Sequence, residues 1–369
     1  MGSIYGTSLM KVQRIRLADQ TESWLVLDDK HLPIPPIQSY LHYLEGLEYS
    51  PNTIHNYATH LKQFWEFLRD FQHQWDAVTV EHLADFIRWL RHPAAKVIAI
   101  QGQAPQRTER TINTILAAVY SFYDYHERVG TVAGLQAYGY TTRHGSKYKS
   151  LLHHIQVGKE QKIKLLKLKE PRQLPTVLTA VQVQQIVTAC HHLRDQLLIC
   201  LLYETGMRIG QVLGLRHVDV RSWDNEIQVV PRTDNTNGAR AKAQASYTVH
   251  VSQPLMRLYA EYLIHEYPEN LDSDYVFVNL WSGQSGQPMR YQTVVALLRR
   301  LSQVTGMALH AHLFRHTHAT DLLRQGWELS YIQKRLGHSN IQTTANTYVH
   351  LQADDLKSAY QQYLTQKET

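Results

Sequence analysis

The first cluster of residues that could do chemistry follows an apolar run ending near Tyr203. Gly206 permits a tight turn, and Arg208 leaves that turn at the start of the next predicted helix. The N-terminus of a helix binds anions through its free backbone N–H groups, so an arginine there suits a negatively charged ligand. Taken alone, an arginine after a turn is usually an ordinary surface residue, and that alternative stays open.

The second cluster, residues 310–318, is rich in histidine. His312 and His316 are four residues apart and would share one helix face, as the ligands of a zinc site do. Against a metal site, the cluster contains no Asp or Glu to complete a ligand set, and Arg315 would repel a cation. A histidine-based metalloenzyme is therefore the less favoured alternative.

The third cluster is Leu336-Gly337-His338-Ser339, with Tyr348 ten residues after the histidine. One tyrosine among 22 indicates nothing by itself. The joint order of basic, imidazole and phenol side chains along the second half of the chain is more informative. In chain order these side chains are Arg208, Lys242, His312, Arg315, His338 and Tyr348.

In this order and spacing the sequence resembles the tyrosine recombinases, the phage-integrase family of site-specific DNA recombinases. The matching stretches are TGMRIGQVLGL, HLFRHTHATDLL and LGHSNIQTTANTY. More loosely, SPNTIHNYATHLKQFWEFL and RTINTILAAVYSFYDY resemble helices of the family's core-binding domain. The resemblance implies a mainly α fold with a small antiparallel β portion. A helical, SAM-like core-binding domain and an α+β catalytic domain would form a clamp around DNA.

The resemblance also implies a role for each clustered side chain. Tyr348 would attack the phosphodiester, forming a covalent 3′-phosphotyrosine and leaving a free 5′ hydroxyl. Arg208 and Arg315 would stabilise the charge on the non-bridging oxygens through forked hydrogen bonds. A tyrosine with a pKa of about 10 is mostly neutral, so its attack needs a proton acceptor, for which His312 is the candidate. His338 would donate a hydrogen bond to the phosphate.

Two further positions follow from the resemblance. Lys242, seven residues before Val249, stands at the family's usual offset for the lysine that protonates the leaving 5′ oxygen, although Arg240 is a nearby alternative. Three residues after Arg208 the family usually carries an acidic side chain that orients the arginine and the histidine, whereas this chain has Gln211. We expect the same reaction with less pH tolerance. The alternative that Gln211 lies on a polar helix face stays open.

The implied function is integration or excision of a mobile genetic element. The free 5′ hydroxyl would attack the phosphotyrosine of a partner duplex, so no ATP, metal or other cofactor is expected. The expected partners are double-stranded DNA recombination sites, a homo-tetramer on two sites, and accessory DNA-bending or directionality proteins. Alternatives are resolution of replicon dimers, a type IB topoisomerase, a telomere resolvase, and a DNA-binding or architectural protein without catalysis.

Helices must position these residues, and the first half of the chain predicts four. Ser50 is a candidate N-cap before Pro51, and apolar residues then recur at steps of three and four over residues 51–70. Thr79 caps a second such run, and residues 110–126 form a third. A short helix is predicted around residues 37–44.

The second half predicts a mixture of helices and strands. Alternating runs at residues 226–230 and 246–251 flank a turn rich in Asn and Gly, which favours a hairpin. The last predicted helix ends at Gly337, in the position of a C-cap. The predicted helices span residues 179–189, 194–203, 253–264, 291–304, 316–324 and 330–336.

Between the two halves, residues 143–172 form a basic segment that contains nine Lys and Arg residues and two acidic residues. Such a segment is either a solvated linker or a contact to a polyanion, of which a phosphate backbone is the commonest. Residues 131–175 also lack apolar periodicity. The predicted divisions are an extension at 1–32, a core-binding domain at 33–145, a linker at 146–175 and a catalytic domain at 176–369. The candidate DNA contacts are Arg143, Lys147, Lys149, Lys159, Lys162, Lys164, Lys167, Lys169 and Arg172.

Composition limits the class of protein. The chain is 43% hydrophobic and 19% charged, enough to bury a sizeable core, and no apolar run approaches the roughly 20 residues needed to cross a bilayer. With two cysteines, neither a disulfide framework nor a cysteine zinc site can form. We expect a cytoplasmic protein associated with the bacterial nucleoid. Residues 1–9 are small and polar, as residues left by cloning often are, and no role is assigned to the extension.

Overall fold

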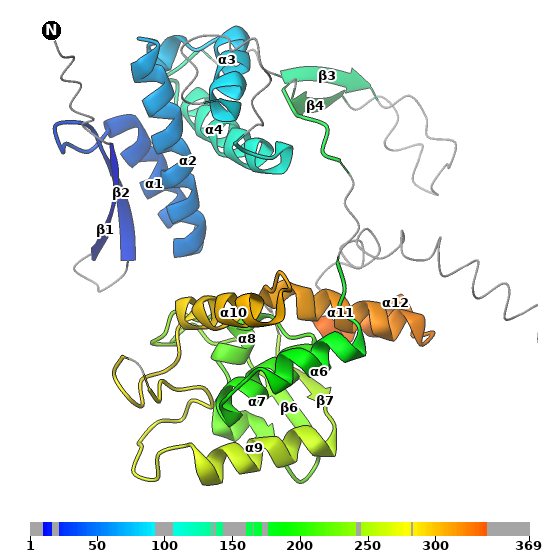
Figure 1. Cartoon of the computed structure of the whole chain (residues 1–369). Helices are drawn as coiled ribbons and strands as arrows, with labels where there is room; N and C mark the ends of the chain where they lie inside the picture. Colours follow the sequence, from blue (N-terminus) through cyan, green and yellow to red (C-terminus); the bar gives the residue numbers. More distant parts are fainter. Residues whose placement is uncertain are drawn as a thin grey trace, which may run out of the picture. The chain divides into compact units, whose positions relative to one another are not determined.

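A computed structural model describes residues 10–16, 22–92, 106–133, 135, 138–142, 160–164, 166–171, 176–240, 245–281 and 283–337. The chain divides into two compact units, Met1–Arg172 and Gln173–Thr369 (Figure 1). Helices dominate both units and the sheets are small and antiparallel, which confirms the predicted fold class. Within the described ranges, no helix is both long and apolar enough to cross a membrane.

The first unit is built on four helices, at the places the sequence predicts. Three of the four start at a hydroxyl side chain that accepts the backbone N–H three residues on, which satisfies one of the free donors of the first turn. The helices are α1 (Pro35–Gly46), α2 (Pro51–Asp70), α3 (Val80–Arg91) and α4 (Glu109–Arg128).

Aromatic rings fill the space between these helices. Phe64 of α2 lies edge-on to Phe86 of α3, with ring centroids 5.0 Å apart, and Phe122 of α4 lies edge-on to Trp65 at 5.3 Å. All three phenylalanines are fully buried. Edge-to-face pairs stabilise a core by about 0.5–1.5 kcal/mol beyond their buried area, so these rings fix how α2, α3 and α4 pack.

The N-terminal extension, to which the sequence assigns no role, contributes a hairpin to this unit. β1 (Lys11–Arg16) pairs antiparallel with β2 (Glu22–Leu27). Met10 and Val26 are buried in the same core as the helices, and Trp24 lies over His55 of α2 at 4.1 Å. The extension is therefore part of the first unit's fold.

The stretch without apolar periodicity, residues 131–175, contains regular structure. β3 (Tyr138–Thr142) pairs antiparallel with β4 (Glu160–Lys164). After β4, Asn113 of α4 exchanges two hydrogen bonds of 2.9 Å with the backbone of Leu168. The sequence predicts no strand in this stretch, because backbone pairing and contacts to α4 replace the apolar periodicity that it lacks.

The second unit surrounds α7, whose side chains are buried on nearly all sides. Figure 1 shows α10, α11 and α12 along one side of this unit and α9 along the other. The predicted hairpin is confirmed, with Ile227 opposite Val249. The helices are α6 (Ala180–Thr188), α7 (Leu193–Thr205), α8 (Ile209–Leu213), α9 (Gln253–His265), α10 (Tyr291–Thr305), α11 (Ala311–Arg324) and α12 (Leu329–Leu336). The sheet has the order β5 (Val220–Arg221), β6 (Glu226–Val229), β7 (Tyr247–His250).

The start of α11 differs from the sequence prediction. The helix begins at Ala311, five residues before the predicted His316. His310 is the N-cap, and its Nδ1 accepts the backbone N–H of Leu313 at 3.1 Å. Histidine is not among the usual N-cap residues, so the sequence did not reveal this start. As a result, His312 and Arg315 lie one turn apart on the helix.

Candidate active site

The turn that carries Arg208 depends on a glycine. α7 ends at Thr205, and Gly206 follows with a φ of 62°, which glycine adopts without strain. A Cβ atom at this position would lie 2.8 Å from both the His318 ring and the Leu336 side chain. Arg208 is then the N-cap of α8, so the turn and the helix start expected around it are present.

Arg315 joins three segments of the second unit. Its side chain, on α11, is 4% exposed. Nη1 donates to the carbonyl of Gly206 at 2.7 Å, and Nη2 donates to the carbonyl of Leu336 at 2.9 Å. The planar guanidinium presents its donors in a fixed fork, so these hydrogen bonds set its orientation. They place Arg315 between the end of α7 and the end of α12.

Arg208 reaches the same end of α12. Its Nη1 lies 3.4 Å from the carbonyl of Gly337, the left-handed C-cap of that helix, as predicted. The two arginines thus contact consecutive residues, Leu336 and Gly337, where helix carbonyls carry partial negative charge. The next residue in the chain is His338. Two of the predicted site residues therefore converge on the segment that leads to a third.

The electrostatics of Arg208 favour an anionic ligand. Burial lowers the pKa of its guanidinium, and the nearby Tyr247 phenol raises it. An arginine pKa lies so far above 7 that the side chain stays charged at neutral pH. A partly buried cation is costly unless it is paired, so binding of an anion at this place is favourable.

Gln211 lies inside the site. It is 3% exposed, which excludes the alternative of a polar helix face. Its Oε1 accepts the backbone N–H of Arg208 at 2.8 Å, and its Nε2 donates to the hydroxyl of Tyr247 at 2.9 Å. The glutamine therefore holds the Arg208 turn against β7 without adding a charge.

The histidines of α11 lie in different environments. His312, the predicted proton acceptor, is exposed on the first turn, and its ring centroid lies 6.4 Å from that of His316. Burial, and then His312 itself, lower the pKa of His316. The part of the chain that the structure describes holds no group of three or more His, Cys, Asp or Glu side chains that could bind a metal ion.

His318 and Arg335 form a contact that the sequence does not predict. Nε of Arg335 donates to Nε2 of His318 at 3.0 Å, and Nη2 donates to the carbonyls of Glu204 and His250 at 3.1 Å each. Burial, reinforced by Arg335 and Arg315, lowers the pKa of His318 to about 3. No spacing rule singles out either residue, because their contact depends on the packing of α11 against α12.

Several predicted site residues remain predictions. Lys242, His338 and Tyr348 lie outside the described residues, as do five of the basic residues, Arg143, Lys147, Lys149, Lys159 and Arg172. Lys162 and Lys164 belong to β4, and Lys167 and Lys169 are exposed just after it.

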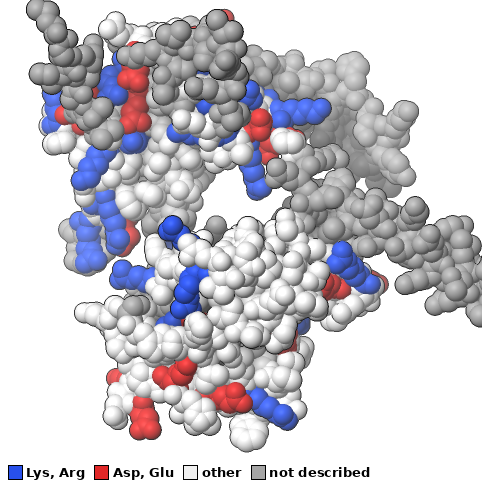
Figure 2. Space-filling view, viewed as in Figure 1, with Lys and Arg blue, Asp and Glu red and all other residues white. Residues whose placement is uncertain are grey.

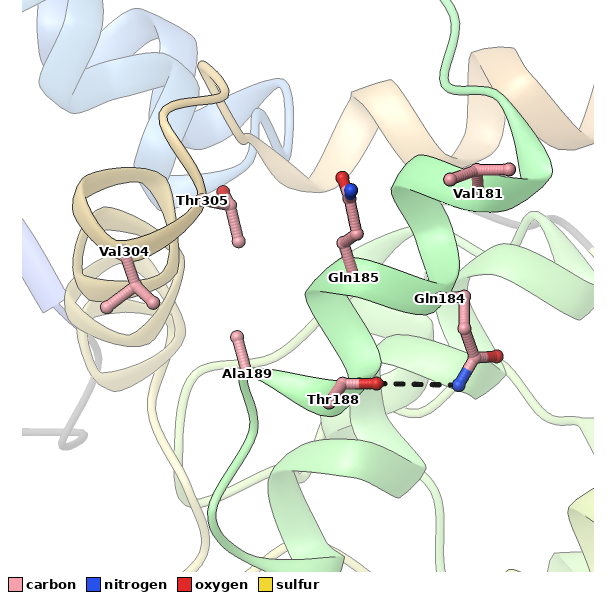
Figure 3. A pocket seen from close by; sticks show the side chains of 7 residues that line it. All are labelled: Val181, Gln184, Gln185, Thr188, Ala189, Val304 and Thr305. Atoms are coloured by element: carbon pink, nitrogen blue, oxygen red, sulfur yellow. Dashed lines mark hydrogen bonds between the residues drawn. The ribbon is translucent and has the colours of Figure 1, made fainter.

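The surface also carries basic side chains and grooves that do not include Arg208 or Arg315. Figure 2 shows Lys and Arg side chains near β1 and β2, where Lys11, Arg14 and Arg16 are exposed, and a mostly uncharged visible face of the second unit. An open groove between α6 and α10 is drawn in Figure 3. It is lined by Val181, Gln184, Gln185, Thr188, Ala189, Val304 and Thr305. None of these side chains titrates, so this groove lacks the groups that acid–base chemistry needs.

Comparisons with known proteins cover both units. The family described as "Phage integrase family" matches residues 176–355, and the "Phage integrase, N-terminal SAM-like domain" matches residues 37–130. Transposase A from transposon Tn554 of Staphylococcus aureus is 44% identical over 361 residues, covering 97% of this chain and 99% of that protein. Tyrosine recombinase XerC of Pseudomonas savastanoi pv. phaseolicola is 25% identical, covering 87% and 92%.

Solved structures show the same fold. The integrase of transposon Tn1549 in complex with transposon right end DNA has a TM-score of 0.59 at 16% identity, covering 89% of this chain and 99% of that one. The XerH site-specific recombinase bound to palindromic difH substrate has a TM-score of 0.58 at 18% identity, covering 84% and 80%.

Proposed function

Because this chain belongs to the phage integrase family of tyrosine-type site-specific DNA recombinases, we propose that it cuts and rejoins the DNA of a mobile genetic element. The similarity to a transposon's transposase, 44% identity along nearly the whole of both chains, supports this role. The XerC relative is more distant, at 25% identity.

The observation that carries the proposed chemistry is the convergence of Arg208 and Arg315 on Leu336 and Gly337. A phosphodiester under attack gathers negative charge on its non-bridging oxygens. Two guanidiniums held by backbone carbonyls can stabilise that charge without reorganising during the reaction. They supply positive charge of the kind that a divalent metal supplies in other phosphoryl-transfer sites.

The proposed reaction conserves phosphodiester bonds. The Tyr348 hydroxyl oxygen attacks the phosphorus and its proton passes to His312, while the bond from phosphorus to the 5′ oxygen breaks and Lys242 protonates that oxygen. His338 donates a hydrogen bond to the phosphate. The 5′ hydroxyl of a partner strand then attacks the phosphotyrosine and reverses these steps. One phosphoester bond replaces another at each stage, so the cycle needs no ATP.

The proposed assembly is a tetramer of this chain on two DNA sites, with the two units of each protomer clamped around duplex DNA. The solved relatives bound to their DNA support the DNA partner. Accessory DNA-bending or directionality proteins belong to the same proposal. The mass of the complex formed on element ends tests the tetramer.

A nicked suicide duplex that carries the element end tests the chemistry. The nick lets the short 5′-hydroxyl strand diffuse away, so the wild-type chain should accumulate a covalent adduct in denaturing gels. Tyr348→Phe should bind the duplex and form none. Tyr331→Phe, an exposed tyrosine on α12, is the matched control and should react normally. An adduct with Tyr348→Phe would assign the nucleophile elsewhere, and loss of activity in EDTA would contradict the metal-free mechanism.

A further inference from the structure

Tyr247 of β7 lies in the proposed site although no sequence pattern singles it out. Its ring packs on Gly337, where a Cβ atom would lie 2.7 Å from the ring and 2.9 Å from the hydroxyl oxygen. Burial raises the pKa of Tyr247, while Gln211, Arg315 and Arg208 lower it. Because the net shift is upward, the phenol keeps its hydrogen at neutral pH. A neutral hydroxyl therefore stands beside both arginines.

The hydrogen-bond partners settle which way the Tyr247 hydroxyl points. A backbone N–H can only donate, so the Gln211 atom 2.8 Å from the nitrogen of Arg208 must be the carbonyl oxygen. The other amide atom is then the nitrogen, which can only donate, and the Tyr247 oxygen 2.9 Å away accepts from it. The phenol hydrogen is left for a different acceptor. Among the described residues, the hydrogen bond from Gln211 is the one that the Tyr247 hydroxyl makes.

We propose that Tyr247 is a further residue of the phosphodiester site and donates its hydrogen to a non-bridging oxygen of the scissile phosphate. The inference rests on the proposed function. The proposal also assigns a role in the reaction to Gln211. A carboxylate at that position would accept the phenol hydrogen and turn it away from the substrate, whereas the glutamine amide leaves it available. The site would then bind the phosphate with two charged donors and one neutral donor.

Single-turnover cleavage of the suicide duplex by Tyr247→Phe is the first test. The change keeps the ring that packs on Gly337 and removes only the hydroxyl. Cleavage should slow on the order of 10²-fold, while the Kd for DNA and the melting temperature stay near those of the wild type. Gln211→Glu should slow cleavage similarly, and adding Tyr247→Phe to it should slow it no further. Tyr291→Phe, on the exposed start of α10, is the matched control.

Methylphosphonate substrates distinguish a direct contact from a structural role. Each diastereomer replaces one of the two non-bridging oxygens with a methyl group. On the diastereomer lacking the contacted oxygen, wild type and Tyr247→Phe should cleave at the same rate, and on the other the deficit should persist. A deficit on both, or a rate for Tyr247→Phe within about twofold of wild type on ordinary DNA, would overturn the proposal. If the wild type forms no adduct with any substrate, the proposed function fails instead.

Discussion

Arg208 and Arg315 should contribute equally to catalysis and very unequally to stability. Arg315→Ala leaves the buried carbonyls of Gly206 and Leu336 without their donor, at about 1–3 kcal/mol each, or roughly 2–6 kcal/mol together. Arg208→Ala removes one interaction of 3.4 Å, at the long limit of a hydrogen bond, and should cost under about 1 kcal/mol. Either change should remove an oxyanion donor and raise the cleavage barrier by about 3–4 kcal/mol.

Thermal unfolding and single-turnover cleavage together check this pair. For a unit of this size, each kcal/mol lowers the melting temperature by about 2–4 °C, so Arg315→Ala should melt roughly 10 °C below Arg208→Ala. Cleavage is compared at a temperature where both variants are folded, and both should be slower on the order of 10²- to 10³-fold. Equal melting temperatures would refute the structural reasoning, and near-normal cleavage in either variant would refute the pairing of the arginines.

The remaining predictions concern other charged groups. The pKa of His318 is about 3 in the folded chain, compared with an ordinary value of 6.5. Below pH 6.5 the imidazole therefore binds a proton in the unfolded chain but stays neutral in the folded chain, so the free energy of unfolding falls as the pH falls. His318→Gln should therefore lose less stability between pH 7 and pH 5 in thermal unfolding, by up to ~2 kcal/mol, and an unchanged loss would contradict the assignment. Lys242→Ala should regain cleavage activity on DNA whose bridging 5′ oxygen is replaced by sulfur, because sulfur leaves without protonation. If cleavage is not restored, another group is the general acid. Neutralising Lys162, Lys164 and Lys167 together should weaken binding to specific and random DNA alike. The slope of log K against log salt concentration should become shallower by about 0.9 for each DNA phosphate that the variant no longer neutralises. An unchanged slope would indicate that the segment is a solvated linker.

Much of the helical framework could be predicted because its signals are local. Ser50 and Thr79 begin helices through their own side chains, and Gly337 ends one through its own backbone freedom. The hairpin β1–β2 escaped prediction because its strand sequence KVQRIR does not alternate cleanly. It is held by burial of Met10 and Val26 in the core of the four helices, which no short stretch of sequence contains.

The sequence by itself determined the family and the types of group available for the reaction. The order of arginines, lysine, histidines and tyrosine along the chain can be recognised without knowing any distance between them. Only the tertiary structure decided that Gln211 is buried and that it forms hydrogen bonds with both Arg208 and Tyr247. Tyr247 is 36 residues from Gln211 and on a different kind of element. Hydrogen bonds between such residues form only where packing brings their segments together, so the direction of the phenol hydrogen follows from the fold.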